Sequence, residues 1–297
     1  MKCDLCPRKC LVDRKKGEKG ICGQTENLKV ARAALHFWEE PCISGDAGSG
    51  AVFFSGCPLH CVFCQNENIA NGTVGKEISL ERLVDIFLEL QEKRANNINL
   101  VTPGHFVPQI VKALDQARKE GLTLPVVYNT SSYETVDTIK MLEGYVDIYL
   151  PDFKYMSQVL SKKYSHAPDY AEVAKAAIAE MVRQTGKAVF VNGDEDNLIL
   201  RGTIVRHLTL PGCMADSMQI LKYLHETYGD MIYISIMNQF TPLSNLEKYP
   251  ELNRRITDEE YETLVDYAID IGIENGFVQE GDTAEESFIP AFDCEGV

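Results

Sequence analysis

Three cysteines stand close together in the stretch SGCPLHCVFCQN, residues 55–66, with the spacing C-x3-C-x2-C. A disulfide framework uses an even number of cysteines, and a structural zinc site takes four ligands. Three thiolates instead suit a cubane iron–sulfur cluster in which three irons each take one thiolate. Clusters with complete protein ligation take four cysteines and transfer electrons. Cys57, Cys61 and Cys64 therefore indicate a 4Fe–4S cluster whose fourth iron is open to a ligand that is not protein.

A second set of cysteines lies near the N-terminus, within residues 1–30. Its spacing is C-x2-C-x3-C-x11-C, and the lysines and arginines around it would stabilise thiolates. Zinc and a second iron–sulfur cluster suit four thiols equally well, and a reduced, partly buried cysteine cluster is the alternative. The members of this second predicted metal site are Cys3, Cys6, Cys10 and Cys22.

Composition excludes several classes of protein. The chain has 297 residues, of which 44 are acidic and 29 are basic, and its net charge is −15. A basic footprint for nucleic acid or an anionic membrane is therefore absent. The sequence has neither a signal-peptide pattern nor an apolar run long enough to span a bilayer. We expect a cytoplasmic protein whose ten cysteines are reduced, some of them as metal ligands.

Short apolar runs alternate with longer amphipathic segments from residue 50 onward. This alternation predicts parallel βα units, and the number of strands favours an open, partial TIM-like barrel of about six units. Residues 188–199 are expected to add a strand and an acidic loop, and a capping box at Thr257 and Glu260 predicts a helix to about residue 272. We expect residues 1–30 to form a Cys-rich segment and residues 31–297 to form the barrel with an acidic C-terminal extension. The predicted strands are 51–55, 97–101, 125–129, 146–150, 203–210 and 231–237, and the predicted helices between them are 79–95, 107–120, 133–143, 168–184 and 215–228.

The three-cysteine loop directly follows the first of these strands. In parallel α/β folds, ligands bind at the carboxyl ends of the strands, where the loops converge. The loop is therefore expected at the active site. Cys213 follows Leu-Pro-Gly near the expected barrel mouth and could face a substrate, whereas Cys42 and Cys294 are expected to pack.

The cysteine spacing, Phe63 before the last cysteine and the preceding strand together resemble the radical S-adenosylmethionine (SAM) superfamily. This resemblance implies that SAM chelates the open iron through its amino and carboxylate groups. One electron then cleaves SAM to methionine and a 5′-deoxyadenosyl radical, which abstracts a hydrogen atom from the substrate. The segments DFK (152–154), RHLTLPG (206–212) and HFWEEPCISGDAGSGAVFF before the cysteine loop resemble the pyruvate-formate-lyase-activating-enzyme branch more closely.

The resemblance implies roles for residues at the ends of the first three strands. Cys57, Cys61 and Cys64 match the catalytic cluster ligands, and the backbone of Phe63 matches the residue that lies against the adenine. Many relatives have a Gly-Gly-Glu motif for the methionyl amine after the second strand. Here the segment is TPGH, which lacks the glutamate, so one of Thr102, Gly104 or His105 is expected to take its place.

Further roles are implied at the ends of the later strands. Asn129 and Ser131 can hydrogen-bond the methionine carboxylate or the ribose, and Arg206 would face the cofactor. Lys154, which stands where the family has a catalytic lysine, would pair with the carboxylate, while Asp152 together with Asn129 could hold a monovalent cation.

Each of these roles has a structural alternative. Lys154 and Asp152 can form a strand-end ion pair, Asn129 and Ser131 can be turn residues, and His105 can be a packed or capping histidine. Trp38, the only tryptophan, either shapes a substrate pocket or anchors the N-terminal segment.

Several functions also remain open at this level. The resemblance implies an electron donor such as flavodoxin or ferredoxin, and either a glycyl-radical enzyme or another protein as substrate. Modification of a small molecule or peptide is an alternative, and so is a non-catalytic iron–sulfur electron carrier. No nucleic-acid or membrane partner is expected.

Overall fold

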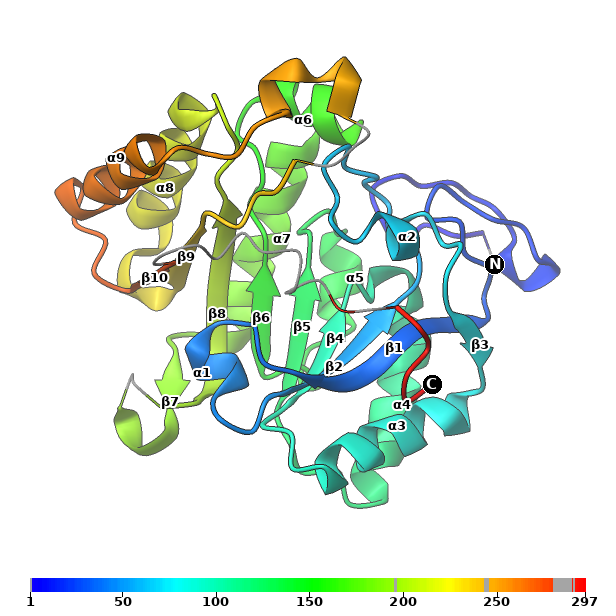
Figure 1. Ribbon diagram of the computed structural model, residues 1–297. Helices are drawn as coiled ribbons and strands as arrows, with labels where there is room; N and C mark the ends of the chain where they lie inside the picture. The colour runs from blue at the N-terminus through cyan, green and yellow to red at the C-terminus, as the bar shows by residue number, and fades with distance from the viewer. Residues whose placement is uncertain (1, 195–196, 243–245, 280–289, 291) are drawn as a thin grey trace.

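The computed structural model describes residues 2–194, 197–242, 246–279, 290 and 292–297. Within them, one series of strands runs parallel in the order β10-β9-β8-β6-β5-β4-β2 (Figure 1). Six of these confirm the predicted strands, and the three-residue β10 was not predicted. The series forms the open partial barrel expected from the βα alternation. Its members are β2 (Ser49–Phe54), β4 (Ile98–Val101), β5 (Val126–Thr130), β6 (Ile148–Pro151), β8 (Ile199–Leu208), β9 (Tyr233–Met237) and β10 (Gly276–Val278).

Two antiparallel strands, which the prediction also lacked, extend the β2 edge. β1 (Leu28–His36) pairs with β2 on one side and with β3 (Lys76–Ile78) on the other. From β1 the chain crosses the front of the sheet to the short helix α1 (Pro41–Ser44), as Figure 1 shows. Residues 37–40 are thereby brought to the barrel, although they precede the βα units in the sequence.

Helices cover the outer face of the sheet. In α3, Leu83, Val84, Phe87 and Leu90 are buried at helical spacing, and the Ser79 hydroxyl caps the N-terminus by accepting from the Arg82 N–H. The capping box before α9 is confirmed. The helices are α2 (Glu67–Ala70), α3 (Leu80–Glu92), α4 (Val107–Lys119), α5 (Val136–Lys140), α6 (Gln158–Ser165), α7 (Tyr170–Thr185), α8 (Met214–Tyr228) and α9 (Asp258–Asp270).

The two faces of the strands carry different side chains. In β5, Tyr128 belongs to the core under α3 and α4, whereas its neighbour Asn129 lines a cavity inside the barrel. In β4, Leu100 packs into the same core, and Asn99 hydrogen-bonds to Glu39. Successive strand residues point to opposite faces. The apolar residues therefore fix the helices outside, and the polar residues are left to face the interior.

The remaining predictions concern residues 188–199 and the acidic C-terminal extension. The strand expected in 188–199 is present as β7 (Val189–Phe190), but it pairs antiparallel with β8 and so is not another barrel strand. The expected acidic C-terminal extension lies largely outside the described residues, at 280–289 and 291. Residues 292–297 lie along β1, where the Ala33 and Cys294 N–H groups donate to the Glu295 and Ala31 carbonyls. In the described part of the chain, no helix has the length and apolar character needed to cross a membrane.

Candidate active site

A cavity of about 400 Å³ lies at the carboxyl ends of the parallel strands. The loop after β2 contributes the three closely spaced cysteines and Phe63 to its wall. The ends of the neighbouring strands contribute most of the residues predicted to bind the cofactor. These lining residues are Cys57, Cys61, Cys64, Phe63, Thr102, Asn129, Ser131, Asp152, Lys154 and Arg206. Most of the predicted site therefore converges on one cavity.

The three thiols share one electrostatic environment. Burial raises the pKa of Cys57 to about 11 and that of Cys64 to about 12, and the neighbouring thiol of Cys61 adds to both shifts. The Lys154 ammonium acts in the opposite direction on all three thiols. The Ser165 hydroxyl also donates to the Cys61 sulfur at 2.9 Å. Ligation requires thiolates, so a nearby cation and a hydrogen-bond donor both suit metal binding.

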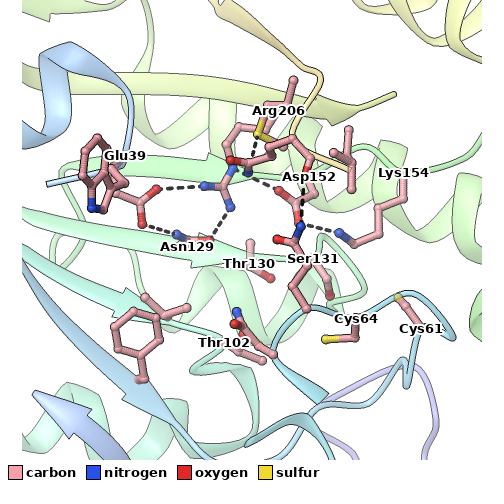
Figure 2. Close-up of a pocket in the computed structure, with 18 of the residues that line it drawn as sticks. Glu39, Cys61, Cys64, Thr102, Asn129, Thr130, Ser131, Asp152, Lys154 and Arg206 are labelled. Carbon is pink, nitrogen blue, oxygen red and sulfur yellow. Dashed lines mark hydrogen bonds and ion pairs between the residues drawn. The ribbon is translucent and has the colours of Figure 1, made fainter. Parts of the chain in front are cut away.

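A network centred on Arg206 lies beside the thiols. Its Nε donates to Asp152 Oδ1 at 3.0 Å, Nη1 to Glu39 Oε2 at 2.9 Å, and Nη2 to Asn129 Oδ1 at 2.7 Å. Asn129 in turn donates to Glu39 Oε1 at 3.2 Å. Figure 2 shows these residues in a row, with Glu39 at one end and Cys61 and Cys64 at the other. All three nitrogens of the guanidinium are therefore engaged, and the network fixes the cavity floor.

Lys154 and Asp152 form an ion pair within this row. Lys154 Nζ lies 2.6 Å from Asp152 Oδ2, and only 16% of each side chain is exposed. Burial alone would raise the pKa of Asp152, but Lys154 and Arg206 hold it below its ordinary value. Burial alone would lower the pKa of Lys154, but Asp152 and Cys61 raise it. Both groups are therefore charged, and an anionic ligand group at Lys154 would share the ammonium with Asp152.

The three residues after β4 that were expected to bind the methionyl amine do not all face the cavity. Thr102 lines the cavity in a left-handed backbone conformation, φ 55°, which a β-branched residue rarely adopts. His105 lies outside the cavity wall, and its Nε2 contacts the Ser55 carbonyl oxygen at 2.7 Å. Burial lowers the pKa of His105 to about 3, so the ring is neutral and Nε2–H donates. Gly104 is also absent from the described wall, because its Cα faces Glu134.

Two lining residues, Glu39 and Glu40, were not predicted from the sequence. Their signal was present in HFWEEP, residues 36–41, where two adjacent acids lie between aromatic residues and a proline. Charged residues are rarely buried unless they are paired. Glu39 accepts hydrogen bonds from Arg206, Asn129 and Asn99. Only the pairing of β1 with β2 brings these acids to the strand ends.

The N-terminal cysteines also lie close to one another. The thiols of Cys3, Cys6 and Cys10 each interact electrostatically with that of Cys22, and burial raises the pKa of Cys6 to about 12. Cys6 and Cys22 each receive a backbone hydrogen bond from the residue two positions later. Among the described residues, no group of three or more His, Cys, Asp or Glu side chains is preformed as a metal site, and this holds for both cysteine sets.

The N-terminal segment is fastened to the cysteine loop and to α6. Arg8 donates to the carbonyl oxygens of Pro58, Ser165 and His166 at 2.8, 3.2 and 2.6 Å. Its guanidinium also lies over the Tyr133 ring, 5.1 Å from the centroid. His60 Nε2 contacts the Ile21 carbonyl at 2.7 Å from the loop side. The two cysteine regions are therefore joined by direct contacts.

A partial barrel with three cysteines after its first parallel strand, an open cavity and a cationic side chain beside the thiols defines an iron–sulfur enzyme that binds a small cofactor. The family model of the radical SAM superfamily matches residues 51–200, half of the chain, and the chain belongs to that superfamily. Membership implies a 4Fe–4S cluster and SAM. The donor set fits this cluster, because three thiols and no fourth cysteine line the described cavity wall.

The chain is also similar to a protein of known sequence and, in its fold, to solved structures. An uncharacterized protein of Methanocaldococcus jannaschii is 27% identical over 275 residues, which are 90% of this chain and 74% of that protein. Streptococcus suis SuiB, solved with bound SAM, matches with a TM-score of 0.52 and 13% identity over 76% of this chain. HydG, a maturase of the FeFe-hydrogenase, matches with a TM-score of 0.51 and 15% identity over 78% of this chain. The matched regions are 48% of SuiB and 52% of HydG, so this chain corresponds to about half of each.

Proposed function

We propose that the protein reductively cleaves SAM and uses the resulting 5′-deoxyadenosyl radical to abstract a hydrogen atom from its substrate. The observation that supports this most directly is the convergence of Cys57, Cys61, Cys64 and Lys154 on one cavity of the barrel. An electron carrier has no need of such a cavity beside its cluster. When bound, the cluster supplies one electron and the open iron to which SAM attaches.

The chain's own residues would bind and orient SAM. Lys154 holds its charge beside the thiols and would attract the methionine carboxylate. Thr102, Asn129 and Ser131 offer hydroxyl and amide groups to the amine and the ribose. Arg206 keeps Asp152 ionised and Asn129 oriented, and so fixes the shape of the site. Phe63 packs against Tyr155 and Phe240 and holds the backbone of the loop against the barrel.

Single substitutions of the loop cysteines test this proposal. Cys57→Ala, Cys61→Ala and Cys64→Ala should each lose the cluster iron and release no 5′-deoxyadenosine from SAM under anaerobic reduction. Iron and sulfide analysis and chromatography of the products measure both effects. Cys294→Ala, a cysteine outside both sets, is the matched control and should keep both. Release of 5′-deoxyadenosine by the triple variant would refute the proposal, and a wild-type protein with four irons but no cleavage products would instead be an electron carrier.

For the substrate, we propose the activating-enzyme role that the segments HFWEEP, DFK and RHLTLPG indicate. In this role the barrel admits a glycine-containing loop of a glycyl-radical enzyme, and a flavodoxin or ferredoxin supplies the electron. Electron paramagnetic resonance of the reduced protein mixed with SAM and a glycyl-radical enzyme should show a glycine-centred doublet. SAM cleavage without this signal would favour a small molecule or another protein or peptide as substrate.

We also propose that residues 1–30 hold a second metal through Cys3, Cys6, Cys10 and Cys22. The backbone donors to Cys6 and Cys22 support this proposal, because such hydrogen bonds favour thiolates. Zinc and a second iron–sulfur cluster remain the two candidates. The proposed monovalent cation would lie at Asp152 and Asn129, both of which hydrogen-bond to Arg206.

A further inference from the structure

Glu40 is a buried acid in the wall of the cavity. Only 7% of the residue is exposed, and its Oε2 has no hydrogen-bond partner. Among the described residues it forms no ion pair within 4.0 Å, whereas its neighbour Glu39 is paired with Arg206 at 2.9 Å. A buried polar atom without a partner is costly, and a carboxylate more so. Glu40 Oε2 therefore needs a hydrogen-bond donor, and the described part of the chain does not provide one.

The acids in the cavity wall also outnumber the cations. Among the described lining residues, three acids, Glu39, Glu40 and Asp152, face only two cations, Lys154 and Arg206. His36 also lines the cavity, but burial, followed by Arg32 and Arg206, lowers its pKa to about 4, so it is neutral. Both cations already contact Asp152. Of the three acids, Glu40 is thus the one without an ion pair to either cation, since Arg206 pairs with Glu39 and both cations pair with Asp152.

The surroundings of Glu40 explain why the chain alone does not satisfy it. Burial raises the pKa of Glu40, Glu39 raises it further, and Arg206 and the Ser235 hydroxyl only partly oppose them. Asn99 offers no help, because its amide nitrogen donates to Glu39, and its own Oδ1 is a second buried acceptor without a donor. A ligand that brings N–H donors and a positive charge into the cavity would supply what Glu40 lacks.

The cavity wall also carries aromatic side chains that suit a cation with an apolar body. Trp38, Phe53 and Phe277 line the same cavity, and aromatic faces attract ammonium and guanidinium groups. A smaller cavity of about 180 Å³ shares His36, Trp38 and Phe53 with it. The two cavities therefore share part of one wall. Glu39, which pairs with Arg206, lies at the opposite end of the row from Cys61 and Cys64 in Figure 2.

We infer that Glu40, supported by the Glu39–Arg206 pair, forms a substrate subsite that binds a cationic nitrogen, an ammonium or a guanidinium group. The inference rests on the proposed function, in which SAM occupies the end near Cys61, Cys64 and Lys154. The same chemistry is offered by a free amine and by a lysine or arginine side chain of a peptide. The subsite would fix which part of the substrate lies within reach of the radical.

Matched probes test the subsite without turnover. Binding of n-butylammonium and of 1-butanol to the reconstituted holoprotein is measured by ligand-observed NMR at about pH 8, where the amine stays protonated. The two probes differ in charge but little in shape. We expect the ammonium to bind at least about 10-fold more tightly, as one charge-assisted hydrogen bond would give. N-acetyl-lysine methylamide represents a lysine side chain of a peptide. Tighter binding of this probe than of n-butylammonium would identify a peptide as the ligand, and the reverse order would identify a free amine.

Substitutions then assign the preference to Glu40. Glu40→Gln keeps the shape and should remove the preference for ammonium, whereas Glu92→Gln, the same change on the exposed face of α3, should leave it intact. Equal binding of ammonium and alcohol by the wild-type protein would overturn the inference, even if Glu40→Gln does not fold. A preference that survives Glu40→Gln would overturn it as well.

The proposed function and the subsite can fail separately. SAM cleavage by the wild-type protein without any ammonium preference would refute the subsite alone. An ammonium preference that depends on Glu40, in a protein that does not cleave SAM, would refute the proposed function and leave the subsite standing.

Discussion

The two cysteine regions differ in how charges face them. The Lys154 ammonium acts on all three loop thiols and opposes the rise of their pKa values, whereas the N-terminal thiols meet separate charges, since the buried acid Glu134 raises the pKa of Cys6 and Arg14 opposes the rise for Cys22. The loop thiols line the cavity, and the N-terminal thiols do not. A ligand site that must also hold an anionic cofactor group gains from a shared cation. A purely structural metal needs only the ligands and the backbone donors, so the comparison suggests chemistry in the loop and support in the N-terminal segment.

The largest expected effect is loss of the N-terminal metal. Replacing both Cys6 and Cys22 by Ser should remove one zinc, or the iron and sulfide in excess of four irons, because two of four ligands are lost. Metal analysis of the anaerobically purified protein measures this. The cluster of Cys57, Cys61 and Cys64 should stay, since its ligands are untouched. An unchanged metal content would show that the N-terminal cysteines only pack.

A change at Glu134 should alter stability with a defined pH dependence. Burial raises the pKa of Glu134 to about 7 from 4.5, although Thr130 and Tyr128 donate to it. The folded state therefore favours the protonated acid. Its contribution to stability is complete below pH 4.5 and is lost as the pH rises through about 7.

Glu134→Gln should consequently stabilise the metal-free protein above about pH 7 by on the order of 3 kcal/mol relative to wild type. The gain should vanish in acid. Urea unfolding at a series of pH values measures it, with Glu92→Gln as the exposed control. A gain that does not depend on pH would mean that Glu134 is ionised in the folded protein, and that Cys6 faces a full negative charge.

A substitution of Lys154 tests the cation that lies beside the loop thiols. Lys154→Met should raise the dissociation constant for SAM by about 10-fold to 100-fold, as a lost charge-assisted hydrogen bond of roughly 1.5–3 kcal/mol would give. Equilibrium binding to the reconstituted protein is the measurement. Lys187→Met removes a lysine from an exposed pair with Asp230, also at 2.6 Å, and should leave binding unchanged. Equal affinities in the two variants would reduce Lys154 to a strand-end ion pair.

The smallest effect concerns the contact between the two regions. Arg8→Ala removes three hydrogen bonds to loop and α6 carbonyls and should lower stability by about 1–2 kcal/mol. Arg118→Ala is a matched control, because Arg118 also binds two carbonyl oxygens and lies over the Tyr145 ring, away from the loop. Both variants should unfold at a temperature a few degrees lower than the wild type, but only Arg8→Ala should slow SAM cleavage. Equal cleavage rates would mean that the segment does not support the loop.

The sequence was informative wherever local periodicity determines structure. Alternating apolar runs and amphipathic segments located six parallel strands, and Thr257 with Glu260 located the start of α9. β1 was missed, because its partners follow it in the sequence and its pattern does not alternate cleanly. β10 has three residues, too few for a periodic signal. The antiparallel pairing of β7 depends on a hairpin with β8 that apolar content alone does not reveal.

The site could be predicted only where a motif or a strand end located it. Cys57 and Asp152 follow recognisable strands, and Asn129 and Arg206 lie in the carboxyl-terminal halves of two others, so their convergence could be expected. Glu39 and Glu40 reach the cavity through the non-local pairing of β1 with β2, which no spacing rule encodes. His105 belongs to a strand-end motif, yet its ring contacts the Ser55 carbonyl instead of the cavity. Side-chain direction after a strand depends on tertiary packing.

The contacts of Arg8 also bear on how the protein is assembled in the cell. Residues 1–30 leave the ribosome before the cysteine loop, so the metal proposed for their four thiols would be able to bind before the loop has been synthesised. Arg8 can bind the carbonyl of Pro58 as soon as that residue emerges, but it reaches Ser165 and His166 only after another hundred or so residues. The loop is thus held on one side early and on the other side late.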